Sequence, residues 1–356
     1  MNLSRRPQPV VFAMDAESLA SPRHYPITFD TAADRIQLVA LDEAKYRAAS
    51  FLDERLLPEV GPGEWASYGD LQRAMTFAGG ECDFIFHIGH VGSTLLSRLL
   101  GDDDHVFAVR EPAILRTLAA AELASEDPTR LEDQTRFFLK FFARVYRTSQ
   151  KTLLKATSFV SEMAPIMMAL SPSASAILMF VSPSVYVTAI LSGEASRAEL
   201  EINSPMRLAR LHRRLGGQYW RPDGLSQGER AAMSWTCEIM ALTQLAEGFP
   251  GRTLWLDFDA LLARPGALLS ATLQRLHGDA PGARIDAMLQ SPHLSRYSKA
   301  PEHAFDSDLR RRVLAQASRE QSLEIARGMA WLNAAGGRHA AIADAVRRIA
   351  SAARAQ

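Results

Sequence analysis

The sequence predicts a three-layer α/β fold, in which a central parallel sheet of about five strands is flanked by helices. Short apolar runs recur along the chain, and each is followed by a polar loop and then by a stretch with helical spacing of apolar residues. Parallel sheets with crossover helices produce this alternation. The first loop of the series contains two glycines between a strand and a helix, which is the context of an anion-binding loop.

The chain begins with a region whose pattern is irregular. Pro22 and Pro26 argue against an early helix. Helices are predicted over residues 44–57 and 68–77, from the spacing of their apolar side chains. We interpret residues 1–80 as an N-terminal elaboration and assign it no role.

The α/β core begins with one clear strand–loop–helix unit. Residues 84–88 are almost all apolar, as expected for a buried parallel strand. A loop follows at residues 89–92, and residues 93–100 place leucines on one face of a helix. Gly101 lies where a helix C-cap belongs.

Four more units repeat this order. Their strands are predicted at residues 106–109, 152–154, 176–181 and 253–258, and the helices that follow end near residues 124, 170, 192 and 276. Ligands of such sheets bind at the carboxyl ends of the strands, so these loops should meet in one crevice.

The remaining sequence is mostly helical in pattern. Helices are predicted over residues 206–215, 227–248, 306–332 and 340–356. The domain organisation expected from these elements is an α/β domain over residues 81–335 and a helical C-terminal tail over residues 336–356.

The composition of the chain indicates which partners and locations are not expected. The 356 residues have a formal net charge of zero, so a basic surface for nucleic acid is not expected. No apolar run approaches the roughly 18 residues of a membrane span, and no signal peptide is apparent. Two cysteines, Cys82 and Cys237, form no disulfide framework, and no metal-binding motif is found. We expect a cytoplasmic protein that binds neither metal nor nucleic acid.

The glycine loop is the strongest candidate site, and it makes the expected fold similar to that of the P-loop NTPases. The loop contains Gly89, His90, Val91, Gly92, Ser93 and Thr94. Its glycines let the backbone approach an oxyanion, while the amides and dipole of the following helix favour negative charge. A nucleotide P-loop would carry a lysine after its last glycine, and here Ser93 follows Gly92 directly. The missing lysine weakens the case for ATP-driven chemistry.

Because of this loop, residues 82–335 resemble the sulfotransferases, whose first loop has variants ending Gly-Ser-Thr before a leucine-rich helix. Five later segments extend the resemblance: residues 109–113 (VREPA), 154–158 (LKATS), 179–185 (MFVSPSV), 254–265 (LWLDFDALLARP) and 295–299 (SRYSK). The resemblance implies a P-loop-like fold and 3′-phosphoadenosine 5′-phosphosulfate (PAPS) as the sulfuryl donor. It also implies that residues 89–94 hold the phosphosulfate.

The donor's 3′-phosphate is where the chain departs from the family pattern. Val181 stands where the family has an arginine, and Ala189 stands where it has a serine. The substitutes proposed for these two positions are Ser182, Ser192, Arg197 and the arginine-rich helix over residues 207–214. The resemblance further implies that Arg296, Tyr297 and Lys299 form a late loop that closes over the donor.

Three residues are candidates for the chemistry of transfer. Glu111 follows a strand and suits a general base for an acceptor hydroxyl, although it could equally be a surface partner of Arg110. His90 could screen the transferring group or point to solvent. Lys155 ends a strand, where its charge could reach the crevice or be solvated.

The leading hypothesis is a PAPS-dependent sulfotransferase that acts on a hydroxyl or amine of a small-molecule acceptor. The alternatives are an ATP-dependent phosphotransferase of the P-loop kinase type and a non-catalytic nucleotide-binding module of the same fold. The sequence indicates neither the acceptor nor the oligomeric state.

Overall fold

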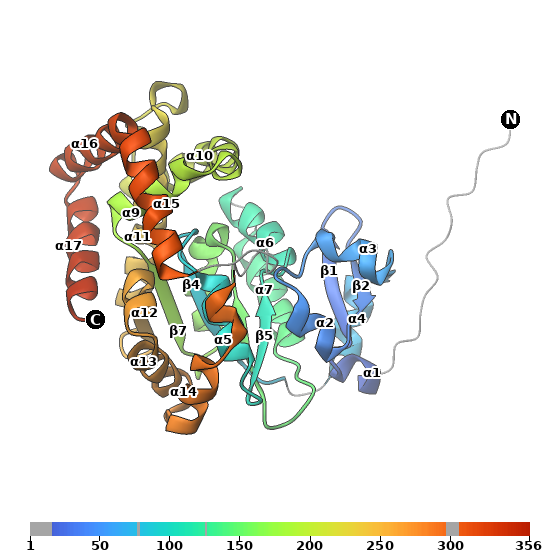
Figure 1. Ribbon diagram of the computed structural model, residues 1–356. Helices are drawn as coiled ribbons and strands as arrows, with labels where there is room; N and C mark the ends of the chain where they lie inside the picture. Colours follow the sequence, from blue (N-terminus) through green and yellow to red (C-terminus); the bar gives the residue numbers. More distant parts are fainter. Residues whose placement is uncertain (1–15, 77–78, 125–126, 297–305) are drawn as a thin grey trace, which may run out of the picture.

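A computed structural model of the chain describes residues 16–76, 79–124, 127–296 and 306–356. Its centre is a five-stranded sheet in the order β5-β6-β4-β7-β8, in which every neighbouring pair is parallel. The strands are β4 (Cys82–His87), β5 (Val106–Arg110), β6 (Lys151–Lys155), β7 (Ala176–Phe180) and β8 (Thr253–Asp257). Helices flank this sheet (Figure 1). The predicted α/β fold with five parallel strands is therefore confirmed.

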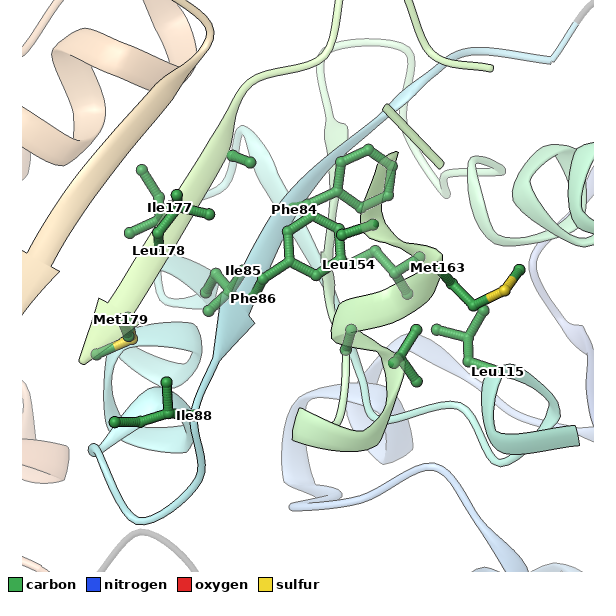
Figure 2. Close-up of a cluster of buried hydrophobic side chains, with 14 of the residues drawn as sticks. Phe84, Ile85, Phe86, Ile88, Leu115, Leu154, Met163, Ile177, Leu178 and Met179 are labelled. Atoms are coloured by element: carbon green, nitrogen blue, oxygen red, sulfur yellow. The ribbon is translucent and has the colours of Figure 1, made fainter. Parts of the chain in front are cut away.

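The central strand β4 is buried along its whole length, which explains its continuous apolar sequence. Phe84 and Phe86 lie on the same face because side chains alternate along a strand. Their rings stack with centroids 5.3 Å apart, and Figure 2 shows them beside Leu154 and Met163. The strand that precedes the glycine loop is thus buried on both of its faces.

The helices of the α/β core mostly agree with the predicted stretches. They are α5 (Ser93–Gly101), α6 (Ile114–Leu123), α7 (Pro128–Phe142), α8 (Ala164–Ala169), α9 (Pro183–Ser192), α10 (Glu194–Leu215), α11 (Gln227–Gly248), α12 (Phe258–Ala263), α13 (Pro265–His277), α14 (Gly282–Leu289), α15 (Ser307–Glu320), α16 (Ser322–Arg338) and α17 (Ala340–Arg354). Short 3₁₀ turns are η2 (Ser158–Met163), η3 (Pro222–Gly224) and η4 (Pro292–Ser295).

Several helices of the α/β core differ from the sequence prediction. The single helix predicted over residues 306–332 is two helices, because the chain leaves helical geometry at Gln321. The helix predicted from residue 206 starts at Glu194 and contains Pro205. Helix α7 was not predicted, although its phenylalanines line its buried face.

The N-terminal region has more structure than the sequence indicated. It contains an antiparallel sheet of β1 (His24–Asp30), β2 (Arg35–Ala40) and β3 (Glu64–Ser67). Its helical elements are α1 (Ala16–Ala20), α2 (Glu43–Ala48), η1 (Glu54–Leu56), α3 (Leu57–Val60) and α4 (Tyr68–Ala74). Pro26 is accommodated at an irregularity in the pairing of β1 with β2. This region lies on the opposite side of the molecule from α16 and α17 (Figure 1).

The helix predicted over residues 44–57 is wrong beyond Ala48. The chain becomes extended at Ala49, and the amide of Leu52 donates to the carbonyl of Arg110 at 2.8 Å. The buried Arg110 guanidinium donates in turn to the carbonyls of Tyr46 and Ala49, at 2.9 and 3.0 Å. Arg110 therefore joins the N-terminal region to the parallel sheet and does not pair with Glu111.

The C-terminal helix α17 packs on the core through Ile342, Ala345 and Ile349. Beyond it, the side chain of Gln356 bonds to the backbone of β8, at Trp255 and Asp257. The predicted helical tail is thus a helix that contacts the edge strand of the sheet.

His212 gives the fold a dependence on pH. Its Nε2 accepts hydrogen bonds from the amides of Tyr219 and Trp220, both at 3.2 Å, which requires the neutral ring. Burial lowers the pKa of His212. The unfolded chain therefore binds this proton more readily, and the stability contributed by His212 is lost as pH falls below about 6.5.

We expect the free energy of unfolding, measured with urea, to fall more between neutral and mildly acidic pH in the wild type than in His212→Gln. An identical pH dependence of the two proteins would exclude this role for His212. The comparison is differential because burial also lowers the pKa of His24 and His277, and these residues are present in both proteins.

Candidate anion-binding and transfer site

The glycine loop turns sharply between β4 and α5. Gly89, His90 and Gly92 have φ angles of 86°, 55° and 64°, in the left-handed region that favours glycine. A side chain on Gly92 would also overlap the ring of Phe258, since a Cβ there would lie 2.0 Å from it. Phe258, at the start of α12, therefore closes directly over the loop, and Gly92 is required by both geometry and contact.

The N-terminus of α5 forms the floor of an anion cradle, which we define as residues 89–94. The first amides of a helix have no intrahelical acceptor, and the helix dipole adds positive potential at this end. Ser93 and Thr94 are both buried. Thr94 is 2% exposed, and its hydroxyl has no hydrogen-bond partner among the described residues. A buried donor without a partner fits an anion bound in front of it.

A cavity of about 480 Å³ opens in front of this cradle, and we call it the first cavity. All six cradle residues line it, together with Glu111 and residues from α9, α10, α12 and α15. Its volume lies within the usual range for small-molecule sites. The expected convergence of loops at the carboxyl end of the sheet is therefore observed for β4, β5, β6 and β8.

Glu111 lies directly after β5 in a strained conformation. Its φ angle is 52°, which is unusual for a residue with a side chain. Its amide donates to the carbonyl of Lys155 at 2.7 Å. The Lys155 ammonium, fully buried at the end of β6, contacts the Glu111 carboxylate. Strain of this kind is held in place by surrounding contacts and is frequent at functional sites.

The two histidines near the cradle have different surroundings. The Nδ1 atom of His87 accepts a hydrogen bond from the amide of Gly89 at 3.0 Å, so the ring proton of a neutral His87 is on Nε2. That Nε2 lies 4.0 Å from the carboxylate of Glu111. His90 lines the first cavity, with its Nε2 3.8 Å from Glu199 on α10.

Among the predicted 3′-phosphate substitutes, only Ser192 lines the first cavity. Arg197 turns back to the carbonyl of Leu191, at 2.7 Å, which satisfies the end of α9. Ser182 precedes α9, with its hydroxyl 3.4 Å from that of Ser184. Neither Ser182 nor Arg197 is brought to the first cavity.

The arginine-rich helix also offers no free cation to the donor. Its arginines are paired with carboxylates: Arg207 and Arg210 with the buried Glu238, Arg213 with Glu122, and Arg214 with Glu162. Within the late basic loop, Arg296 follows η4 and does not line the first cavity. Tyr297 and Lys299 lie outside the described residues.

Sequence reasoning missed Arg310 on α15. Its guanidinium pairs with Asp259 and lies 5.0 Å from the centroid of the Phe258 ring. Its Nη2 atom is buried and has no hydrogen-bond partner within the described parts of the chain. Arg310 lines the first cavity beside Phe258, and Ser196 on α10 was missed as well. The spacing of apolar residues predicts α15 as a helix. It cannot predict where on the sheet this helix packs.

A second cavity, of about 550 Å³, meets the first at Glu111, Thr157 and Glu199, which line both. The remaining residues that line it come from the N-terminal region and from α6, η2 and α10. They are Phe51, Asp53, Glu54, Arg55, Arg116, Ala119, Ala120, Phe159, Asn203 and Met206. Glu111 thus lies where the first and second cavities meet.

Comparison with known proteins finds similarity only among solved structures. No protein-family model matches the chain, and no curated protein matches it. A sulfotransferase domain from the curacin biosynthetic pathway is 12% identical, with a TM-score of 0.39, over 68% of this chain and 98% of that one. The sulfotransferase STF9 from Mycobacterium avium is 12% identical, with a TM-score of 0.40, over 71% of this chain and 79% of that one.

The sulfotransferase domain of the Synechococcus PCC 7002 olefin synthase is 13% identical, with a TM-score of 0.39, over 69% of this chain and 96% of that one. These similarities concern the fold of the chain. No helix in the described residues has the length and apolar character needed to cross a membrane. The same residues contain no cluster of three or more histidine, cysteine or acidic side chains suited to a metal ion.

Proposed function

We propose that this chain transfers a sulfuryl group from PAPS to a hydroxyl or an amine of a small-molecule acceptor. The observation that carries the proposal is the position of Glu111, which borders both the cavity in front of the anion cradle and the second cavity. A base at such a junction can take a proton from an acceptor in one cavity while the acceptor attacks a group held in the other.

The residues of the first cavity fit the phosphosulfate end of the donor. The α5 amides and the Thr94 hydroxyl, for which no described residue is a hydrogen-bond partner, supply donors for oxygens that carry negative charge. Arg310 and Ser192 supply a cation and a hydroxyl elsewhere in the same cavity. We propose them, together with Ser196, as the groups that contact the 3′-phosphate in place of those missing at Val181 and Ala189.

In the proposed reaction the acceptor oxygen forms a bond to sulfur, while the bond between sulfur and the donor's phosphate oxygen breaks. The phosphate keeps the electron pair of the broken bond, and the acceptor's proton passes to the Glu111 carboxylate. The cradle amides and His90 stabilise charge on the transferring and leaving groups. Lys155 does not line either cavity, so we assign it the role of holding Glu111 in position.

Calorimetric titration with adenosine 3′,5′-bisphosphate tests the donor. We expect this product of the proposed reaction to bind more tightly than Mg-ATP, because the loop lacks the lysine of nucleotide P-loops. Binding of Mg-ATP without binding of the bisphosphate would favour a kinase and overturn the proposal. Binding of neither nucleotide would favour a protein that has the fold without the donor site.

The substitution Thr94→Val tests the cradle with little change in side-chain shape. Because a hydrogen bond to a charged group contributes about 1.5–3 kcal/mol, the Kd for adenosine 3′,5′-bisphosphate should rise roughly 10- to 100-fold. Thr243→Val is the matched control, since this hydroxyl on α11 is also buried without a described partner but lines neither cavity. Equal affinities of the two variants for adenosine 3′,5′-bisphosphate would show that Thr94 does not contribute to binding it.

A further inference from the structure

We infer that the anion cradle has a second wall, in which the Ser158 hydroxyl donates a hydrogen bond to the bound oxyanion. Arg207 is a positioning residue for this contact, because it fixes the direction in which that hydroxyl can donate. The inference rests on the proposed function, since it takes the cradle as the place where the donor's phosphosulfate binds. It adds a contact from η2 to the contacts that α5 supplies.

Ser158 lies beside the first glycine of the cradle. It begins η2, the 3₁₀ turn that follows β6, and β6 pairs with the strand that leads into the cradle. A Cβ atom on Gly89 would lie 3.5 Å from the Ser158 hydroxyl oxygen. Ser158 lines the first cavity, although only 4% of the residue is exposed. The neighbouring strand therefore contributes a buried polar group to the cavity in which the anion is proposed to bind.

The direction of the Ser158 hydroxyl is set by Arg207. The Arg207 guanidinium donates from Nη2 to the Ser158 oxygen at 3.1 Å, and from Nε to the Glu238 carboxylate at 3.0 Å. A guanidinium has no acceptor, so the serine oxygen accepts in this contact and its own hydrogen points elsewhere. Across the residues that the structure describes, this hydroxyl donates to no acceptor. A buried donor of this kind needs a partner, and a bound oxyanion can supply one.

Arg207 can hold the hydroxyl in this orientation because it is itself held in place. It is 4% exposed, and its guanidinium lies 5.0 Å from the centroid of the Phe159 ring. Its partner Glu238 is fully buried and also accepts from Arg210 at 3.0 Å. A hydroxyl that accepts from a charged group is polarised and donates more strongly. Ser158 is therefore prepared to bind an acceptor of hydrogen bonds, such as a phosphate or sulfate oxygen.

Calorimetric titration of the full chain with inorganic pyrophosphate tests the second wall. Pyrophosphate has two linked oxyanion groups, as the phosphosulfate of the donor does, but no adenosine. We expect Ser158→Ala to raise the Kd for pyrophosphate roughly 10- to 100-fold, the effect of losing a hydrogen bond to a charged group. Ser234→Ala is the matched control, because Ser234 is a buried serine of α11 that lines neither cavity. Its Kd should equal that of the wild type.

Arg207→Lys tests the positioning role. Lysine keeps the positive charge but lacks the rigid fork with which Arg207 reaches Ser158 and Glu238 together. We expect Arg207→Lys to raise the Kd for pyrophosphate about two- to tenfold in the wild type, and to have no further effect in Ser158→Ala. A purely structural loss would weaken binding equally in both backgrounds. Arg207→Gln, which keeps an amide donor, is the second variant for the same comparison.

An unchanged Kd for pyrophosphate in Ser158→Ala, or no binding of pyrophosphate by the wild type, would overturn the second wall. Equal effects of the Arg207 substitutions in both backgrounds would reject the positioning role. The two proposals fail separately when adenosine 3′,5′-bisphosphate is titrated alongside. Pyrophosphate binding that depends on Ser158, without binding of the bisphosphate, would reject the proposed donor alone. Bisphosphate binding together with an unchanged pyrophosphate Kd in Ser158→Ala would reject the second wall alone.

Discussion

Glu111→Gln is expected to lower kcat for sulfuryl transfer by about 10²- to 10⁴-fold, the range attributed to a positioned general base. Glutamine keeps the shape of the side chain but cannot take the acceptor's proton. The measurement is release of adenosine 3′,5′-bisphosphate from PAPS, with the best acceptor of the wild type from a panel of small alcohols and amines. The Kd for the bisphosphate should stay close to that of the wild type, because the cradle is unchanged.

The contact with Lys155 requires a second variant, since Glu111→Gln also leaves a buried ammonium group without its carboxylate. Glu111→Asp keeps the negative charge but withdraws it by one methylene, so it should be slower than the wild type and faster than Glu111→Gln. A Glu111→Gln protein that folds, binds the bisphosphate and keeps wild-type turnover would rule out Glu111 as the base. Loss of bisphosphate binding together with activity would indicate a structural role instead.

The second large effect is expected on stability, at Glu238 of α11. This carboxylate is fully buried and accepts hydrogen bonds from Arg207 and Arg210, both at 3.0 Å, and from Ser161 at 2.6 Å. Although burial alone would lower the pKa of Arg210, the charge of Glu238 raises it. Removing the carboxylate would leave the buried Arg207 guanidinium without its described acidic partner and Arg210 with Glu162 alone.

Glu238→Gln should therefore lower the free energy of unfolding by about 3–5 kcal/mol, as measured by urea denaturation. Glu122→Gln is the matched control, because Glu122 pairs with the partly exposed Arg213 and should cost less than about 1 kcal/mol. Similar losses in the two variants would mean that the buried cluster contributes no more than a surface ion pair. Arg207 also donates to Ser158, which lines the first cavity, so Glu238→Gln should weaken bisphosphate binding in the protein that remains folded.

The parallel sheet and its first loop were predictable because they depend on local sequence. Continuous apolar runs mark buried strands, and two glycines between a strand and a helix mark a tight turn. The structure brings the predicted residues Glu111 and Lys155 into contact because parallel strands end at the same edge of a sheet. The alternation of elements predicts that these strand ends lie at one edge of the sheet. It does not predict the order of the strands.

The groups opposite the loop could not be predicted in the same way. Arg310 reaches the first cavity because α15 packs over α9 and Phe258, a placement that no periodicity encodes. The N-terminal sheet was missed because β1 contains Pro26 and β3 has only four residues. Charge patterning was misleading at residues 207–214, where arginines that looked available for a ligand are paired with acids from distant segments.

The hydrogen bond between Leu52 and Arg110 has a consequence for how this protein could diversify. Residues 51–55 belong to the N-terminal region, in the connection between α2 and β3, and they line the second cavity without forming any part of the glycine loop. Substitutions there can change which acceptors bind, while the residues of the first cavity that would bind the donor stay the same. One part of the chain would then determine the range of substrates, and another part would keep the reaction constant.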